Sequence, residues 1–177
     1  MKIGEIHVKD LRTGNYKWIE KETNKWYNLA EDTTTEVVWD KDTANTIENE
    51  LKKGQIRVIK VDKDNNEVKL EGVEFEVLDE NGNVLEKIIT DENGEALTQR
   101  YPIRDFEKLI LREVATQEDY VLNEEPQTIE LTEDEITNIT FENERIKGFV
   151  EITKVDSKDK DKKLEGAKFG LYDENDE

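Results

Sequence analysis

The sequence contains no cysteine, only two prolines and a single histidine, His7. Without cysteine the chain can form neither a disulfide framework nor a thiolate metal site. Its one serine, Ser157, lies in a charged turn, so no nucleophile is paired with a histidine base. These absences argue strongly against a hydrolase.

Basic residues are scarce relative to acidic ones, at 26 against 45, which gives a net charge of −19. Such an acidic chain is poorly suited to bind nucleic acid or an anionic membrane surface. No apolar run is long enough to cross a bilayer, and the Met-Lys-Ile start lacks the apolar core of a signal peptide. We therefore expect no nucleic-acid partner and no membrane contact by this segment.

Hydrophobic residues are also few, at 34% of the chain, whereas 40% of the residues are charged. This composition is lean for one core of 177 residues, but it is adequate for small sandwiches with solvated outer faces. Alternating β-branched residues and an internal repeat argue against disorder.

The repeat is clearest in two stretches that end in the same three residues, IRVIKVD at 56–62 and VEITKVD at 150–156. Both are typical of strands, in which side chains two apart share a face. The face that ends in lysine is the one that is apolar in both copies. Lys60 and Lys154 therefore each continue an inward-facing row, which is an unusual position for an ammonium group.

Further echoes at a spacing of 93 or 94 residues divide the chain into domain-sized repeats. Residues 54–146 form one complete repeat. Residues 1–53 resemble the C-terminal part of a preceding repeat, and residues 147–177 resemble the N-terminal part of a following one.

The complete repeat is predicted to be all-β, with no convincing amphipathic helix. Strands are expected near residues 55–62, 73–78, 84–90, 95–99, 107–114, 127–131 and 137–143, with a tight hairpin at Asn81-Gly82 and a turn at Tyr101-Pro102. This pattern favours a Greek-key sandwich of immunoglobulin-like size. In the first fragment we expect strands near 5–10, 15–22, 34–39 and 43–50.

Two more polar residues end inward-facing rows in the complete repeat: Glu113 follows two leucines, and Asn143 follows Ile139 and Phe141. The first fragment has Glu20 and Asn49 at the matching positions. The simplest interpretation is a buried ion pair with a hydrogen-bonded asparagine. That arrangement is costly to bury and needs good geometry to break even, so its recurrence suggests a chemical role.

These motifs resemble the Cna B-type (prealbumin-like) repeat domains of Gram-positive surface adhesins and pilins. The family signature is a K-x-D strand, an L-x-G-A-x-F segment, an E-x-x-A-P-x-G-Y segment and a final strand closed by asparagine. The resemblance spans nearly the whole chain, and it departs where the family's A-P-x-G is replaced by residues 116–119. The matching residues are Lys60-Val61-Asp62, Leu70, Gly72, Phe75, Glu113, Tyr120 and Asn143, then Lys154, Asp156, Leu164, Gly166, Ala167 and Phe169.

The resemblance implies a spontaneous isopeptide bond between Lys60 and Asn143, assisted by Glu113, and no cofactor. Desolvation favours the neutral forms of amines and carboxyl groups, and enforced proximity supplies the rate. It also implies a stalk module of an extracellular, cell-wall-anchored protein of a Gram-positive bacterium, which would not be an enzyme apart from this single turnover. Its partners would be neighbouring repeats of the same protein.

Two alternatives remain open on the sequence. The first is a ligand-binding adhesin domain that recognises a host extracellular matrix protein, because stalk and binding modules share this fold. The second is a calcium loop at Asp62, Asp64 and Asn66, although its sixth and twelfth positions, Glu67 and Val73, do not fit a calcium loop.

Overall fold

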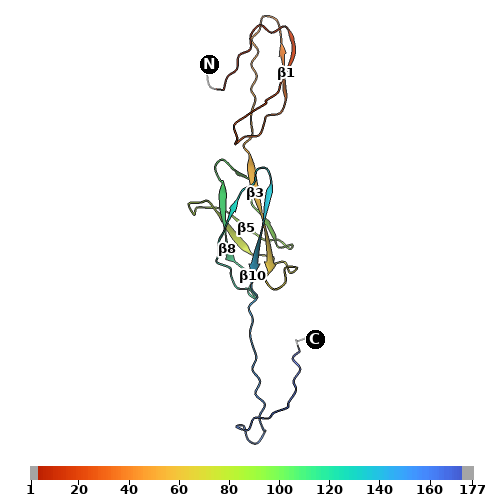
Figure 1. Ribbon diagram of the computed structural model, residues 1–177, viewed down its shortest axis with the longest axis vertical. Coiled ribbons are helices and arrows are strands. Elements are labelled where there is room, and N and C mark those ends of the chain that lie inside the picture. The colour runs from red at the N-terminus through yellow and green to blue at the C-terminus, as the bar shows by residue number, and fades with distance from the viewer. Residues whose placement is uncertain (1–3, 173–177) are drawn as a thin grey trace. The chain divides into compact units, whose positions relative to one another are not determined.

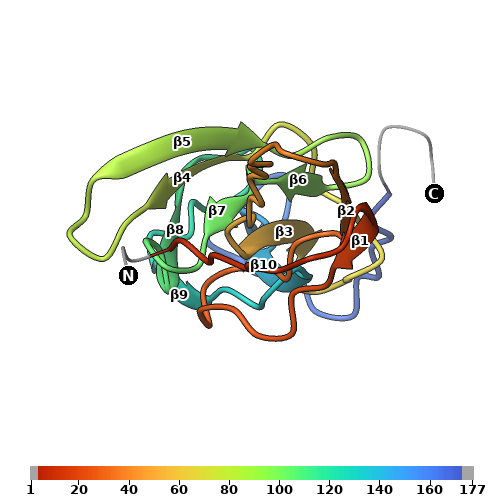
Figure 2. The ribbon, with the colours of Figure 1, turned by 90° about the horizontal axis from the view of Figure 1, so that it is seen from above.

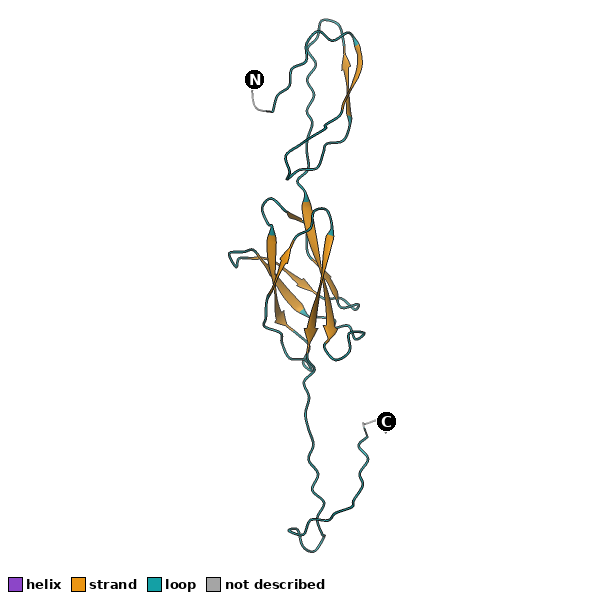
Figure 3. Ribbon diagram, in the orientation of Figure 1, coloured by secondary structure: helices purple, strands orange, loops and turns teal. Residues whose placement is uncertain are grey.

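The computed structural model describes residues 4–172, and in this range it contains strands and no helix (Figures 1 and 3). None of these residues therefore belongs to a helix long and apolar enough to cross a membrane. The all-β fold class predicted from the sequence is confirmed. The strands are β1 (Gly14–Trp18), β2 (Thr33–Val37), β3 (Lys53–Asp62), β4 (Glu74–Leu78), β5 (Val84–Ile89), β6 (Glu95–Leu97), β7 (Tyr101–Pro102), β8 (Lys108–Ala115), β9 (Gln127–Glu130) and β10 (Ile136–Asn143).

Strands β3 to β10 form two facing sheets of four strands each. One sheet has the order β10-β3-β6, with β7 also pairing with β3, and the other has the order β5-β4-β8-β9. Figure 2 shows the two sheets as separate layers. The first and last strands of the repeat, β3 and β10, lie side by side and run parallel. This pairing brings residues far apart in the sequence together at one end of the sandwich.

The alternation of β3 explains which side faces the core. Ile56, Val58 and Lys60 are all fully buried, whereas the residues between them are only partly buried. The apolar members of this row pack against the inner face of the other sheet, which carries Val77 and Leu111 among others. The lysine is thus a member of a core-facing row and shares its burial.

The hairpin between β4 and β5 is confirmed at Asn81-Gly82. The amide of Gly82 donates to the Asp79 carbonyl, and the glycine has a positive φ of 82° that its missing side chain permits. The turn expected at Tyr101-Pro102 is instead the short strand β7, because both residues pair with the start of β3. Proline is tolerated there because the pair is short and lies beside the sheet's main path.

In the first fragment, β1 and β2 form a separate antiparallel sheet, as expected near residues 15–22 and 34–39. The strands expected near 5–10 and 43–50 do not form. Alternating sequence alone does not make a strand, because a ladder needs a backbone hydrogen-bonding partner, and among the described residues neither segment pairs with a strand.

Residues 146–177 separate from residues 1–145 as a second compact unit. Within its described part, up to residue 172, the chain makes one isolated bridge, Val155 to Lys163, and no strand. The division of residues 1–145 near residue 53 stays a prediction.

Gly94 supports the backbone of the buried lysine directly. Its carbonyl accepts a hydrogen bond from the Lys60 amide at 2.7 Å, and its φ is 69°. A Cβ at this position would lie 2.6 Å from the Lys60 carbonyl oxygen. By contrast, a Cβ on Gly82, which has a similar φ of 82°, would meet no atom within 4 Å.

We expect Gly94→Ala to lower the free energy of unfolding by about 1–3 kcal/mol more than Gly82→Ala does, because both substitutions strain a left-handed residue but only the first overpacks the chain against β3. Urea denaturation of the two variants measures the difference. Equal losses would contradict the close packing of Gly94 on Lys60.

Candidate functional site

Three polar residues from three strands meet at one end of the sandwich core. Lys60 on β3 and Asn143 on β10 come from neighbouring parallel strands, two positions apart in register. Glu113 comes from β8, in the facing sheet. Their exposures are 0%, 1% and 2%, so bulk water does not reach them. The three rows inferred from the sequence therefore end at one point.

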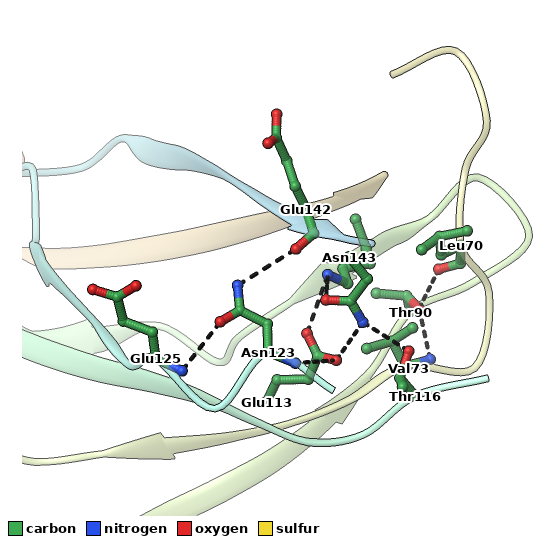
Figure 4. Close-up of polar contacts among 10 residues, drawn as sticks. Leu70, Val73, Thr90, Glu113, Thr116, Asn123, Glu125, Glu142 and Asn143 are labelled. Atoms are coloured by element: carbon green, nitrogen blue, oxygen red, sulfur yellow. Dashed lines mark hydrogen bonds and ion pairs between the residues drawn. The ribbon is translucent and has the colours of Figure 1, made fainter. Parts of the chain in front are cut away.

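Each contact among these residues has a definite direction. The Lys60 Nζ donates to Asn143 Oδ1 at 2.6 Å, and Asn143 Nδ2 donates to Glu113 Oε1 at 2.5 Å. Glu113 Oε2 lies 3.1 Å from Nζ, although the approach is not aligned as a hydrogen bond. Figure 4 shows the Glu113 carboxylate and the Asn143 amide pointing toward one another. The carboxylate thus lies beside both nitrogen atoms.

Two buried phenylalanines are neighbours of the cluster in the strand register. Phe141 is paired in register with Lys60, and Phe75 is paired with Glu113 in the facing sheet. The two rings meet edge to face with their centroids 4.9 Å apart, and both are fully buried. Burial lowers the pKa of Lys60, and the charge of Glu113 only partly opposes this effect. An ammonium in this environment is therefore shifted toward the neutral, nucleophilic amine.

A second cluster of polar side chains lies at the end of β3. The Tyr120 hydroxyl donates to Asp62 Oδ2 at 2.8 Å, and Arg145 donates to the tyrosine hydroxyl at 2.7 Å while lying 3.4 Å from the same carboxylate oxygen. The other carboxylate oxygen accepts the amides of residues 64 and 65. The hydrogen bond from Tyr120 is the main cause of the lowered pKa of Asp62.

The hydrogen bonds of Asp62 bear on the alternative that residues 62–73 form a calcium-binding loop. Both oxygens of Asp62, the first residue of the supposed loop, accept hydrogen bonds from the protein. The described residues contain no group of three or more histidine or acidic side chains arranged to hold a metal ion. The loop after β3 is accounted for as a turn stabilised by an aspartate side chain.

Comparison with known proteins agrees with this architecture. The family model for the SpaA prealbumin-like fold domain matches residues 54–145, more than half of the chain. The chain belongs to this family. The resemblance to Cna B-type (prealbumin-like) domains is thereby confirmed. A search of curated proteins gives no match.

Among solved structures, the chain is similar to the Bacillus anthracis TIE protein, with 28% identity and a TM-score of 0.61 over 77% of this chain. It covers 26% of that protein, about a quarter of its length. It also resembles BcpA, the major pilin subunit of Bacillus cereus, with 22% identity, a TM-score of 0.48 and coverage of 66% of this chain and 35% of that one. A third similar structure is GBS52, the minor pilin of Streptococcus agalactiae, with 18% identity, a TM-score of 0.47 and coverage of 83% and 66%.

The other residues singled out by the repeat lie outside the prealbumin-like domain. In the first fragment the Asn49 Nδ2 donates to Glu20 Oε2 at 2.5 Å, which reproduces the contact between Asn143 and Glu113. None of the described residues forms an ion pair with Glu20. Lys154, the counterpart of Lys60, belongs to the second unit and is exposed.

Sequence reasoning missed Thr116 as a member of the prealbumin-like domain's site. Its Oγ1 accepts the second hydrogen of Asn143 Nδ2 at 2.8 Å. Both N–H donors of the amide and its oxygen therefore have a partner, which fixes the orientation of the amide. A signal was present in the repeat, because Thr23 lies three residues after Glu20, as Thr116 lies three residues after Glu113.

The isopeptide bond that the family resemblance implies would form between Lys60 and Asn143 with release of the amide nitrogen as ammonia. If Thr116 orients that amide, Thr116→Val should slow the release about tenfold, because one hydrogen bond worth about 1–1.5 kcal/mol disappears. Thr116→Ser keeps the hydroxyl and should retain the normal rate. For the measurement, each chain is purified unfolded in urea and then allowed to refold, and its intact mass is followed over time. Equal rates for the valine and serine variants would show that Thr116 does not position Asn143.

The Asp62 contact predicts a pH-dependent stability. A carboxylate with a lowered folded pKa contributes stability above its unfolded pKa of about 3.9, and this contribution is lost as the pH falls through the folded pKa. Tyr120→Phe removes the largest cause of that shift. Its destabilisation should therefore be larger at pH 7 than at pH values below the unfolded pKa. Urea denaturation of both proteins across this range provides the test, and a loss independent of pH would contradict it.

Proposed function

We propose that this chain is a structural module of a pilus or stalk-type surface protein, stabilised by an isopeptide bond between Lys60 and Asn143. The observation that carries the proposal is the fully buried Nζ of Lys60, 2.6 Å from the Asn143 amide oxygen and 3.1 Å from Glu113. An amine, a carboxamide and a proton carrier are thereby held within contact distance in a site that excludes water.

The reaction is an aminolysis of the side-chain amide. The neutral Lys60 Nζ attacks Cγ of Asn143, a bond forms between them, and the bond from Cγ to Nδ2 breaks. Nζ loses a proton and Nδ2 gains one, so that the products are a secondary amide and ammonia. Neither reactant is strong in water, so proximity and desolvation must supply most of the rate.

Glu113 is the proton carrier in this proposal. Its Oε2 lies beside the nucleophile, and its Oε1 accepts a hydrogen bond from the group that leaves. One carboxylate can therefore take the proton from Nζ and deliver it to Nδ2 without moving far. The chemistry happens once per molecule, because the product bond consumes both reacting side chains. The module is a non-enzyme apart from this single turnover.

The bond would connect the first strand of the domain to the last across 83 residues. By the loop-entropy argument used for disulfides, such a cross-link contributes about 4–5 kcal/mol of stability. It also changes the load path. Tension entering at Lys53 would run along β3 to Lys60, cross to Asn143 and leave at the end of β10. The residues between 60 and 143 would carry none of it.

We place this role at the surface of a Gram-positive bacterium, as the resemblance to Cna B-type (prealbumin-like) domains implies. The cross-link needs no oxidant, in keeping with a chain that has no cysteine. We propose neighbouring repeats or subunits as the module's partners. Binding of a host matrix protein stays a hypothesis that a direct binding assay with such proteins would test.

Intact mass under denaturing conditions tests the bond itself. The folded wild-type chain should be lighter than its sequence mass by one ammonia for this site. Lys60→Ala and Asn143→Ala should each restore the unmodified mass, because each removes one reacting group. Glu113→Gln keeps the shape of the side chain but removes the proton carrier, and it should do the same.

A matched control is Lys63→Ala, since Lys63 lies three residues further on and its side chain makes an exposed ion pair with Glu144. The hydrogen bond from the Lys63 backbone amide to the Asn143 carbonyl is kept in this variant. This variant should keep the mass loss. A wild-type mass equal to the sequence mass after native purification would sink the proposal and leave the three residues as a buried polar cluster.

A further inference from the structure

Each of the three chain segments that bring a reacting residue to the site also supplies a residue to the polar cluster at the end of β3. Asp62 follows Lys60 by two positions on β3. Arg145 follows Asn143 by two positions, just beyond the end of β10. Tyr120 lies in the loop that leads from β8, the strand of the reacting carboxylate, to β9. We call Asp62, Tyr120 and Arg145 the polar clamp.

Tyr120 is the centre of the polar clamp. Its hydroxyl donates to Asp62 Oδ2 at 2.8 Å and accepts a hydrogen bond from Arg145 at 2.7 Å, and the guanidinium lies 5.2 Å from the centroid of the tyrosine ring. The hydrogen bond from Tyr120 lowers the pKa of Asp62, so this carboxylate is charged at neutral pH. Asp62 and Tyr120 are buried, and hydrogen bonds shielded from water are stronger than exposed ones. The polar clamp therefore joins three segments without a covalent bond.

The backbone connects the polar clamp to the reacting groups. In the ladder between β3 and β10, Asp62 lies directly opposite Asn143. Beyond this ladder, Tyr120 forms an isolated antiparallel bridge with Arg145. The loop that holds Tyr120 begins with Thr116, whose hydroxyl contacts the Asn143 amide. A loosened clamp would therefore move both the asparagine and the groups that support it.

The proposed reaction needs such support before any bond exists. Lys60 and Asn143 are 83 residues apart in the sequence, so their contact depends on how firmly two distant segments are held together. Asn143 is the last residue of β10, an edge strand whose one partner in its sheet is β3. Strand ends open more easily than strand centres. A shift of about 1 Å between reacting groups can slow a reaction about a hundredfold.

We propose that the polar clamp of Asp62, Tyr120 and Arg145 positions Lys60 and Asn143 for isopeptide formation. This inference rests on the proposed function. The three clamp residues are positioning residues, because they act through the backbone and exchange no proton with the reacting groups. Before the bond forms, they hold the ends of β3 and β10 in register and keep the loop after β8 against them. After the bond has formed, the covalent link maintains this alignment by itself.

Refolding of unreacted chains tests the polar clamp. Full-length wild type and Tyr120→Phe are kept unfolded in urea from lysis onward and then refolded at neutral pH. Circular dichroism follows the folded fraction, and intact mass follows the release of ammonia. Tyr120→Phe removes the hydroxyl that joins Asp62 to Arg145, so each folded molecule should release ammonia about tenfold more slowly than wild type does. The variant should still lose one ammonia in the end, because all three reacting groups are present.

Two control variants separate positioning from stability. Leu131→Ala truncates a buried side chain that lies close to Gly54 at the start of β3, at the other end of the strand from Lys60. It should lower the stability of the domain, yet its folded molecules should release ammonia at the wild-type rate. Glu144→Ala removes an exposed ion pair with Lys63 that also joins the segments beyond β3 and β10. It should keep the wild-type rate as well.

Arg145→Ala tests the polar clamp without a change in the core, since the Arg145 side chain is half exposed. Its folded molecules should also release ammonia more slowly than wild type. The double variant Tyr120→Phe/Arg145→Ala should be slowed by less than the product of the two single effects, because both substitutions break the same hydrogen bond. A slowing equal to the full product would show that the two residues act separately, which would overturn the clamp as a unit.

The wild-type arm distinguishes failure of the clamp from failure of the proposed function. Wild type that folds but releases no ammonia would overturn both. Wild type that reacts, with folded Tyr120→Phe and Arg145→Ala reacting at the same rate, would overturn the polar clamp alone. An equal slowing in folded Leu131→Ala would also overturn it, because the rate would then follow the stability of the domain and not the alignment of the two strand ends.

Discussion

The placement of the Lys60 ammonium in the core is the constraint on which the rest of this domain depends. An isolated charge in that position would cost several kcal/mol, and pairing alone seldom recovers the loss. Asn143 and Glu113 lie beside it with short contacts, and Phe141 lies opposite Lys60 in the strand register. Burial lowers the pKa of Lys60, which favours the neutral amine, and the proposed amide bond would remove the remaining cost of burying a charge.

The order of the strands in the two sheets brings the three polar side chains together and restricts their positions. Parallel pairing of β3 with β10 puts Lys60 and Asn143 two register positions apart, and the facing sheet brings Glu113 from the other side. Gly94 and Thr116 then fix the backbone of the lysine and the rotation of the amide. The precision of the site comes from strands and their close neighbours, which are more rigid than loops.

Alternation along strands made the inward rows of Lys60, Glu113 and Asn143 predictable, because a period of two holds whatever the register of the sheet. The internal repeat then identified the residues at the matching positions of the two partial repeats. Thr116 could not be placed this way, since it follows β8 in a loop whose path depends on tertiary packing. The strand expected near residues 43–50 failed for a related reason: a strand needs a partner, and sequence patterns describe only one side of the ladder.

The two copies of the lysine motif show that burial of the lysine comes from the closed sandwich and not from the motif itself. Lys60 is fully buried between sheets, whereas Lys154 keeps the same local turn and is exposed. Only closure desolvates the amine and brings a carboxamide and a carboxylate to it together. The chain contains many lysines and asparagines, so a requirement for the closed core would select one lysine and one asparagine from among them. A proposed bond that requires the completed core can join only the pair that the fold has aligned.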